Sequence, residues 1–189
     1  NNNYTIDYNF ESFRPKLKET SKKIIFLTQE ELEQIKSVDL GTKSYLERVR
    51  DVLLFCCYTG LRYSDAYNLC KHDVKDNLIE FVTKKTNDFL SVELNKHSRA
   101  ILAKYENIAF ENGKALPVIS NQKMNEYLKE LGEIAEINEP IRETYYIGNE
   151  RIDDVKPKHE HLSTHVGRRT FICTALSLGI PAQVVMKWT

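Results

Sequence analysis

The chain is poor in the residues that build disulfide-linked or membrane-embedded proteins. It holds four cysteines, one tryptophan and two methionines among 189 residues. Cys56 and Cys57 are neighbours in an apolar helical stretch, where their sulfur atoms cannot readily pair, so the pattern excludes a disulfide framework. No signal peptide is recognisable, and no apolar run is long enough to span a bilayer. These absences predict a protein of a reducing cytoplasm without membrane contact.

An excess of one charge is also missing. The 27 basic residues equal the 27 acidic residues, so the formal net charge is zero. Overall charge therefore gives no argument for a nucleic-acid partner, and any affinity for DNA must come from local clusters. Basic residues do cluster, at Lys156 and Lys158 and again at Arg168 and Arg169.

The hydrophobic fraction of 41% over 189 residues is enough for one domain with a full core. Apolar spacing predicts mostly helices with a small antiparallel hairpin edge, so the predicted fold class is α+β, mainly α. Residues 1–25 are polar and irregular, which is typical of a linker or arm, and the domain is expected over 26–189. Helices are predicted at 28–37, 42–58, a short segment after Ser64, 96–111, 121–136, 164–179 and after Pro181, and hairpins at 74–94 and 141–155.

The stretch with the clearest chemical character is Thr-His-Val-Gly-Arg-Arg-Thr-Phe at 164–171. Thr164 is a good helix N-cap, which would place His165 at the first helical position and Arg168 one turn later. Residues three apart share a helix face, so the imidazole and the guanidinium should point the same way. Both lie where free N–H groups and the helix dipole favour an anion. The pattern therefore suggests a site that handles phosphate.

A second stretch, Tyr-Thr-Gly-Leu-Arg-Tyr-Ser-Asp, lies about a hundred residues earlier at 58–65. Gly60 is expected to end the preceding apolar helix, and Ser64 to cap the next one. Arg62 falls in the tight joint between the two helices, where it either faces a ligand or bridges to a nearby carboxylate. Asp65 in the first turn either complements the helix dipole or supports that arginine.

A basic turn lies between two predicted strands. The sequence Thr-Lys-Lys-Thr-Asn-Asp at 83–88 separates an apolar strand from Phe-Leu-Ser-Val-Glu-Leu at 89–94, so a hairpin with lysine at its tip is expected. Loops are often rich in lysine, and Lys84 and Lys85 compete for any chemical role.

Together these stretches resemble the catalytic domain of the tyrosine recombinases, the family that includes phage integrases and Xer-type resolvases. The family pattern is Thr-Gly-Leu-Arg-x-Ser-Glu/Asp early and His-x-x-Arg late, and the likeness extends from about residue 26 to the end. The phrases at 162–164 and 184–189 look most like integrases of Bacteroides-type mobile elements, which implies a bacterial cytoplasm. The resemblance implies the catalytic residues Arg62, Lys85, His165 and Arg168, with Asp65 in support.

What the resemblance implies about chemistry is specific. A tyrosine attacks a phosphodiester of double-stranded DNA at a recombination site, forming a 3′-phosphotyrosine, and strand exchange reverses the step without metal or cofactor. The complete enzyme is expected to act as a homo-tetramer on DNA, and the linker to join a core-binding domain. In the family pattern, Gly-His or Gly-Trp and then the nucleophilic tyrosine would follow Thr189. We therefore expect a catalytic domain cut before its nucleophile and inactive alone, with Trp188 a packing residue.

Alternative interpretations remain open at this point. Tyr145 and Tyr146 are tyrosines ahead of the His-x-x-Arg stretch and are interpreted as strand residues rather than nucleophiles. A zinc site at His159, His161 and His165 would lack a recognisable fourth ligand, so no metal is expected. The chain could instead be a DNA-binding module that shares the fold but does not catalyse. A phosphodiesterase that uses His165 as nucleophile would need a second acid or base and a metal, and the sequence offers neither.

Overall fold

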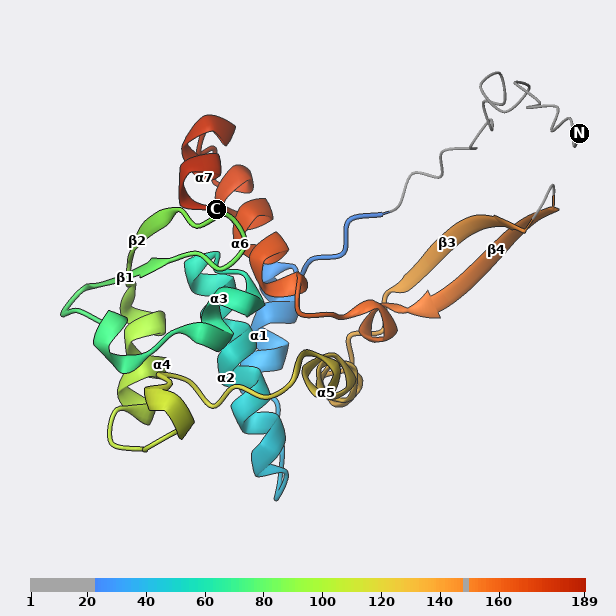
Figure 1. Cartoon of the computed structure of the whole chain (residues 1–189). Coiled ribbons are helices and arrows are strands. Elements are labelled where there is room, and N and C mark those ends of the chain that lie inside the picture. Colours follow the sequence, from blue (N-terminus) through green and yellow to red (C-terminus); the bar gives the residue numbers. More distant parts are fainter. Residues whose placement is uncertain (1–22, 148–149) are drawn as a thin grey trace, which may run out of the picture.

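The computed structural model describes residues 23–147 and 150–189. A body of helices carries a two-stranded sheet on one side, and a second hairpin projects away from the body on the other (Figure 1). The predicted linker at 1–25 lies almost wholly outside the described residues, as does the Gly148-Asn149 turn. The structure confirms the α+β, mainly α class. Across the described ranges, no helix combines the length and apolarity needed to cross a membrane.

The first helices form where the local signals predicted them. Helix α1 (Gln29–Ser37) begins with a capping box, in which Thr28 and Glu31 each satisfy a backbone N–H of the other. Helix α2 (Ser44–Thr59) is the central core helix, and Val52, Leu53, Phe55 and Cys56 are among its buried side chains. It ends at Gly60, which adopts a left-handed conformation with φ of 73°.

A short helix and the first hairpin follow. Helix α3 (Tyr63–Asn68) leads through a 3-10 turn (Lys71–Asp73) to strands β1 (Leu78–Val82) and β2 (Phe89–Glu93). The strands pair antiparallel, with Leu78 opposite Glu93 and Val82 opposite Phe89. Ile79 is buried against the core, so one face of this small sheet covers the helices.

Helix α4 (Lys96–Tyr105) is shorter than the predicted 96–111. The prediction was wrong about its end because the Lys71 ammonium donates hydrogen bonds to the carbonyls of Glu106 and Ile108, which satisfies backbone groups just beyond the helix. After a 3-10 turn (Glu111–Gly113), helix α5 (Asn121–Ile134) begins at the cap Ser120. Its inner face is Met124, Leu128 and Leu131.

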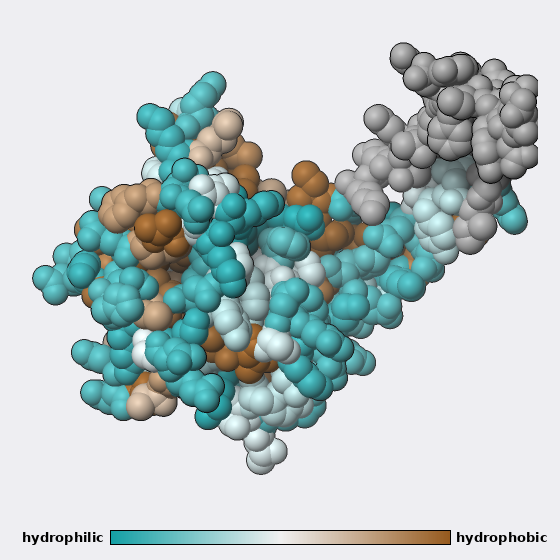
Figure 2. Space-filling model, in the orientation of Figure 1, coloured by the Kyte–Doolittle hydropathy of each residue, from teal (hydrophilic) through white to brown (hydrophobic). Residues whose placement is uncertain are grey.

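The last third of the chain holds the projecting hairpin and the two closing helices. Strands β3 (Pro140–Ile147) and β4 (Glu150–Pro157) pair along their full length and confirm the predicted hairpin. A 3-10 turn (Lys158–His161) leads to α6 (Val166–Ser177), which packs against α2, and then to α7 (Ala182–Trp188). Figure 2 shows a mostly hydrophilic face with apolar patches, one of them near α7. The exposed apolar side chains of α6, α7 and the loop between them include Leu176, Leu178, Val184, Met186 and Trp188.

Candidate active site

The joint between α2 and α3 presents Arg62. Its backbone is extended, with φ of −67° and ψ of 147°, and it occupies the position before the first residue of α3. The prediction that Ser64 caps this helix is wrong, because the helix already begins at Tyr63. The Arg62 carbonyl accepts the first hydrogen bonds of the helix, from the N–H groups of Asp65 and Ala66. The Arg62 side chain is 30% exposed, and its Nη1 lies 4.0 Å from Oδ2 of Asp65. Arg62 thus both contacts a carboxylate and remains open to a ligand.

Arg168 reaches the same joint from α6. Its Nη1 donates a hydrogen bond to the carbonyl oxygen of Gly60 at 3.1 Å. Burial lowers the pKa of the Arg168 guanidinium, nearby Arg62 lowers this pKa further, and Asp65 acts in the opposite direction. An arginine remains charged under such shifts, so two cations lie close together beside one carboxylate. The excess positive charge is suited to an oxyanion.

Two glycines allow this approach. A Cβ on Gly167 would lie 2.6 Å from Cβ of Cys56, so α6 crosses α2 at a distance that only glycine permits there. A Cβ on Gly60 would lie 2.7 Å from the ring of Phe171, which packs over the joint. Gly60 of the first stretch therefore packs against α6, and Gly167 of the second stretch packs against α2.

Asp65 connects the joint to the first hairpin. Its side chain is buried, and Oδ1 accepts a hydrogen bond from the backbone N–H of Lys84 at 3.2 Å. The turn at 83–88 is closed by the N–H of Thr83 bonding to the carbonyl of Asp88, and by the N–H of Asn87 bonding back to Thr83. Asp65 therefore contacts both Arg62 and the turn of the first hairpin, and its supporting role stays a prediction.

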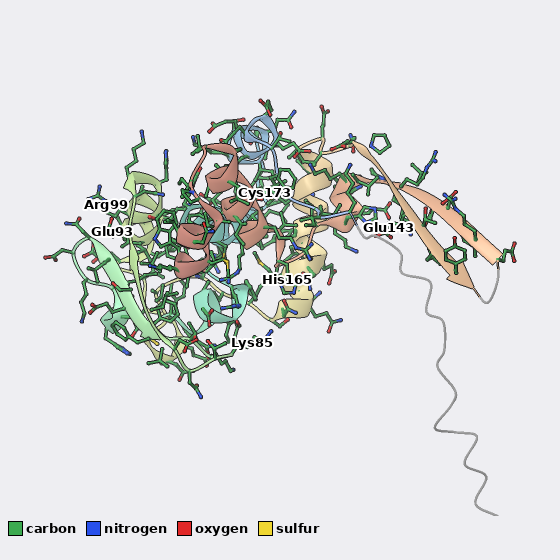
Figure 3. All side chains as sticks on the ribbon, turned by 90° about the horizontal axis from the view of Figure 1, so that it is seen from above. Lys85, Glu93, Arg99, Glu143, His165 and Cys173 are labelled. Atoms are coloured by element: carbon green, nitrogen blue, oxygen red, sulfur yellow. The ribbon has the colours of Figure 1, made fainter. Side chains whose placement is uncertain are left out.

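The two lysines of the turn differ in their surroundings. Lys84 is held through its backbone and lines a cavity of about 190 Å³ together with Asp65. Lys85 is exposed, and within the described ranges its ammonium has no hydrogen-bond or ion-pair partner. Figure 3 places Lys85 and His165 toward the same side of the molecule, with Glu143 out on the projecting hairpin.

His165 lies at the beginning of α6 and is exposed. The prediction that Thr164 caps this helix is wrong. Its hydroxyl instead donates to Oδ1 of Asn121 at 2.9 Å, and its N–H donates to Oδ1 of Asn125 at 2.9 Å. Both asparagines are on α5, and nothing in the spacing along the chain had pointed to them.

The lysines and tyrosines of the projecting hairpin and the turn after it were also considered in the sequence. Lys156 pairs with Asp154 at 3.0 Å, and Lys158 is buried with its ammonium 2.6 Å from Glu31, so the expectation that these lysines form a basic cluster is wrong. The reason is that each lysine forms an ion pair within the chain, Lys156 with Asp154 and Lys158 with Glu31. Tyr145 and Tyr146 lie in β3, as expected of strand residues.

Metal and thiol chemistry find little support. His159 contacts Asn138, and His161 lies 3.5 Å from Glu143, so these two histidines have separate partners. Among the described residues, three potential ligand atoms lie within 4.8 Å of one another only at Cys70, His72 and Asp73, and His72 is exposed. Burial raises the pKa of the Cys56 thiol to about 12, so this cysteine packs as an apolar group rather than as a nucleophile.

Comparison with known proteins gives a consistent structural result. No protein-family model and no curated protein sequence matches the chain. Among solved structures, the XerA recombinase has a TM-score of 0.62 at 16% identity, over 88% of this chain and 56% of that one. The lambda integrase catalytic core has a TM-score of 0.61 at 14% identity, over 87% of this chain and 90% of that one.

A larger lambda integrase fragment, solved as a dimer on a core site, gives a TM-score of 0.65 at 13% identity, over 97% of this chain and 60% of that one. The chain spans about half the length of the XerA and XerH recombinases that it matches, 56% and 51%. In the comparisons with XerA and the two lambda integrase structures, the likeness extends over 87% to 97% of the chain. The chain therefore has the fold of the tyrosine recombinase catalytic domain.

Proposed function

We propose that this chain is the phosphate-binding part of a site-specific tyrosine recombinase, an integrase of a bacterial mobile element. The parent protein would cleave and rejoin DNA through a 3′-phosphotyrosine, with a tyrosine that follows Thr189 as the nucleophile. The observation that best supports this is that Arg168, bonded to the carbonyl of Gly60, comes close to Arg62 beside the buried carboxylate of Asp65. Two guanidiniums from stretches a hundred residues apart form a site for one phosphate.

Each residue has a distinct role in the proposed reaction. Arg62 and Arg168 donate hydrogen bonds to the non-bridging oxygens, whose negative charge grows as the phosphorus becomes five-coordinate. The tyrosine oxygen forms a bond to phosphorus, and the bond from phosphorus to the 5′-oxygen breaks. Lys85 gives its proton to that leaving oxygen, and His165 carries the proton of the attacking hydroxyl. Asp65 holds the Arg62 guanidinium and the backbone of Lys84 at fixed positions relative to each other.

Double-stranded DNA is the proposed partner, bound by a homo-tetramer of the complete protein. The side chains of Lys84, Lys85, His165 and Arg169 are exposed near or on the elements of the site. Because the chain has no net charge, DNA should be held by this local group of cations rather than by a general positive field. Binding should weaken steeply with salt, since each phosphate contact releases counterions.

The test uses the parent protein with a nicked DNA substrate that traps the cleaved strand. A covalent protein–DNA adduct that survives denaturation is expected, and Arg62→Lys should slow its formation by about a hundredfold or more because lysine cannot grip bidentately. Specific DNA binding without any adduct from the wild-type protein would favour the non-catalytic module. A normal cleavage rate in Arg62→Lys would overturn the assignment of Arg62.

A further inference from the structure

Thr164 is the residue immediately before His165, and two side chains of α5 hold it. Its backbone N–H donates to Oδ1 of Asn125 and its hydroxyl donates to Oδ1 of Asn121, both at 2.9 Å. Asn121 and Asn125 are four residues apart and share one face of the first turns of α5. Thr164 itself is buried, while Asn125 is half-buried and Asn121 is exposed, so the two bonds are partly buried.

The asparagines present oxygen, not nitrogen, to Thr164. A backbone N–H can only donate, so Asn125 must accept, and a carboxylate at the same position would accept equally well. An alanine there would leave a buried N–H without a partner, which costs more than the bond itself contributes. The backbone N–H therefore requires an acceptor at Asn125, and at Asn121 the amide oxygen accepts from the hydroxyl of Thr164.

Helix α5 is a firm support for this contact. Its inner face is buried, and at its far end Gly132 packs so closely against the turn before α6 that a Cβ would lie 2.5 Å from Leu162 and 2.9 Å from His159. The segment 159–164 is thus held at two separated points along α5. The imidazole of His165, by contrast, has no hydrogen-bond or ion-pair partner within the parts of the chain that the structure describes. Its place is set by the backbone that precedes it.

We propose that Asn121 and Asn125 are positioning residues for His165, and this rests on the proposed recombinase function. By accepting from the N–H and from the hydroxyl of Thr164, the pair fixes where α6 begins and so directs the imidazole toward the phosphate held by Arg62 and Arg168. The pair takes the place of a conventional helix cap, which would orient the helix but would not tie it to a neighbouring helix. Misplacing a reacting group by about 1 Å can slow a reaction by about a hundredfold.

The experiment compares cleavage rates in the parent protein on the nicked substrate. Asn121→Ala/Asn125→Ala should slow adduct formation by about tenfold to a hundredfold. Asn121→Asp/Asn125→Asp retains both acceptors and should stay within about threefold of the wild type, and Gln122→Ala, an exposed α5 side chain, serves as the matched control. Equal loss in the Ala and Asp pairs would overturn the acceptor role.

A combination with His165→Ala separates positioning from a general structural effect. If the asparagines act through His165, the Ala pair should slow the His165→Ala protein by less than about twofold, although it slows the wild type strongly. Full additivity of the two effects would overturn the proposal. Wild-type protein that forms no adduct would instead refute the recombinase function itself, and normal cleavage by the Ala pair would refute only the positioning role.

Discussion

Arg168 donates a hydrogen bond from Nη1 to the carbonyl oxygen of Gly60, which lies 108 residues earlier in the chain, at 3.1 Å. The acceptor is available because Gly60 turns the chain into a left-handed conformation at the end of α2. The same residue lies under the ring of Phe171, one turn after Arg168 on α6. Gly60, which ends α2, thus contacts two residues of α6, Arg168 and Phe171. A change at Gly60 should therefore affect both the packing of α6 and the position of the Arg168 side chain.

Gly60→Ala should destabilise the protein through two effects that a control can separate. Left-handed backbone costs an alanine about 1 kcal/mol. The added Cβ would also lie 2.7 Å from Phe171, and such overpacking costs about 1–3 kcal/mol more. Gly41→Ala is the matched control, because φ there is +54° and nothing lies within 4 Å of the new Cβ. Urea unfolding should show a larger loss for Gly60→Ala, and equal losses would contradict the close packing of Phe171.

Gly167→Ala should also destabilise, even though alanine favours helix by about 1 kcal/mol over glycine. The new Cβ would lie 2.6 Å from Cβ of Cys56 and 3.3 Å from the carbonyl of Leu53, so α6 must move away from α2. Removing the Cβ in α2 should relieve the clash, so Cys56→Gly/Gly167→Ala should lose less stability than the sum of the two single variants. A stabilising effect of Gly167→Ala would show that the helices do not cross this closely.

Two lysines two residues apart should respond very differently to the same substitution. Lys158 keeps only 5% of its side chain exposed and binds Glu31 at 2.6 Å, whereas Lys156 is 47% exposed beside Asp154. Lys158→Met leaves the Glu31 carboxylate, whose side chain is only 13% exposed, without its cation and should cost about 3 kcal/mol. Lys156→Met should change stability by less than about 0.5 kcal/mol.

Urea unfolding of the two lysine variants provides the measurement. Adding Glu31→Gln to Lys158→Met should recover part of the loss, because the uncompensated charge is then gone. Neither lysine should affect the salt dependence of DNA binding, since both are paired within the fold. A strong loss of DNA affinity in Lys156→Met, with stability unchanged, would restore the basic cluster that the sequence had suggested.

The features that sequence reasoning predicted well are set by neighbours along the chain. The capping box of Thr28 and Glu31 and the helix stop at Gly60 depend on contacts a few residues apart. Both hairpins pair strands that follow each other directly along the chain, so their patterns are also visible in the sequence. The resemblance of two short stretches to known motifs correctly predicted the fold. The roles of Arg62, Lys85, His165 and Arg168 remain predictions that the experiments must test.

The features that were missed depend on partners far away in the chain. Thr164 looks like a cap in isolation, but Asn121 and Asn125 on another helix accept hydrogen bonds from its hydroxyl and its backbone N–H. Lys158 looks like a surface cation, but Glu31 draws it into the interior. No local pattern distinguishes Lys156 from Lys158, because burial is decided by the tertiary packing.

Alkaline pH should weaken the fold through the buried thiol of Cys56. Burial raises its pKa from the ordinary 9.0 to about 12, so between these values the unfolded chain loses a proton that the folded chain keeps. The stabilising contribution is complete below pH 9 and is lost as pH rises toward 12, with a slope of up to about 1.4 kcal/mol per pH unit for one thiol.

Cys56→Ala should therefore flatten the dependence of unfolding free energy on pH. Urea unfolding at pH 8 and pH 10.5 measures the slope, and the variant should lose less stability than the wild type between the two. At pH 8 the two proteins should differ only by the packing loss, which does not depend on pH. An identical slope in both proteins would mean that the thiol is not protected from ionisation in the folded state. The neighbouring Cys57, whose pKa burial also raises, would then be the next variant to measure.

Lys85, rather than Lys84, should be the proton donor to the leaving oxygen. The backbone N–H of Lys84 is bound to Asp65, while the Lys85 ammonium is exposed at the tip of the turn. Lys85→Ala should slow cleavage in the parent protein by about a hundredfold or more, the typical contribution of a positioned general acid, and Lys84→Ala should slow it far less. A DNA substrate with sulfur in place of the 5′-bridging oxygen provides the decisive comparison. A thiolate leaves without a proton, so Lys85→Ala should cleave this substrate at nearly the wild-type rate, whereas Arg168→Ala, which lacks a phosphate ligand, should remain slow. Rescue of Lys84→Ala instead of Lys85→Ala would reverse the assignment, and rescue of neither would remove both lysines from the proton transfer.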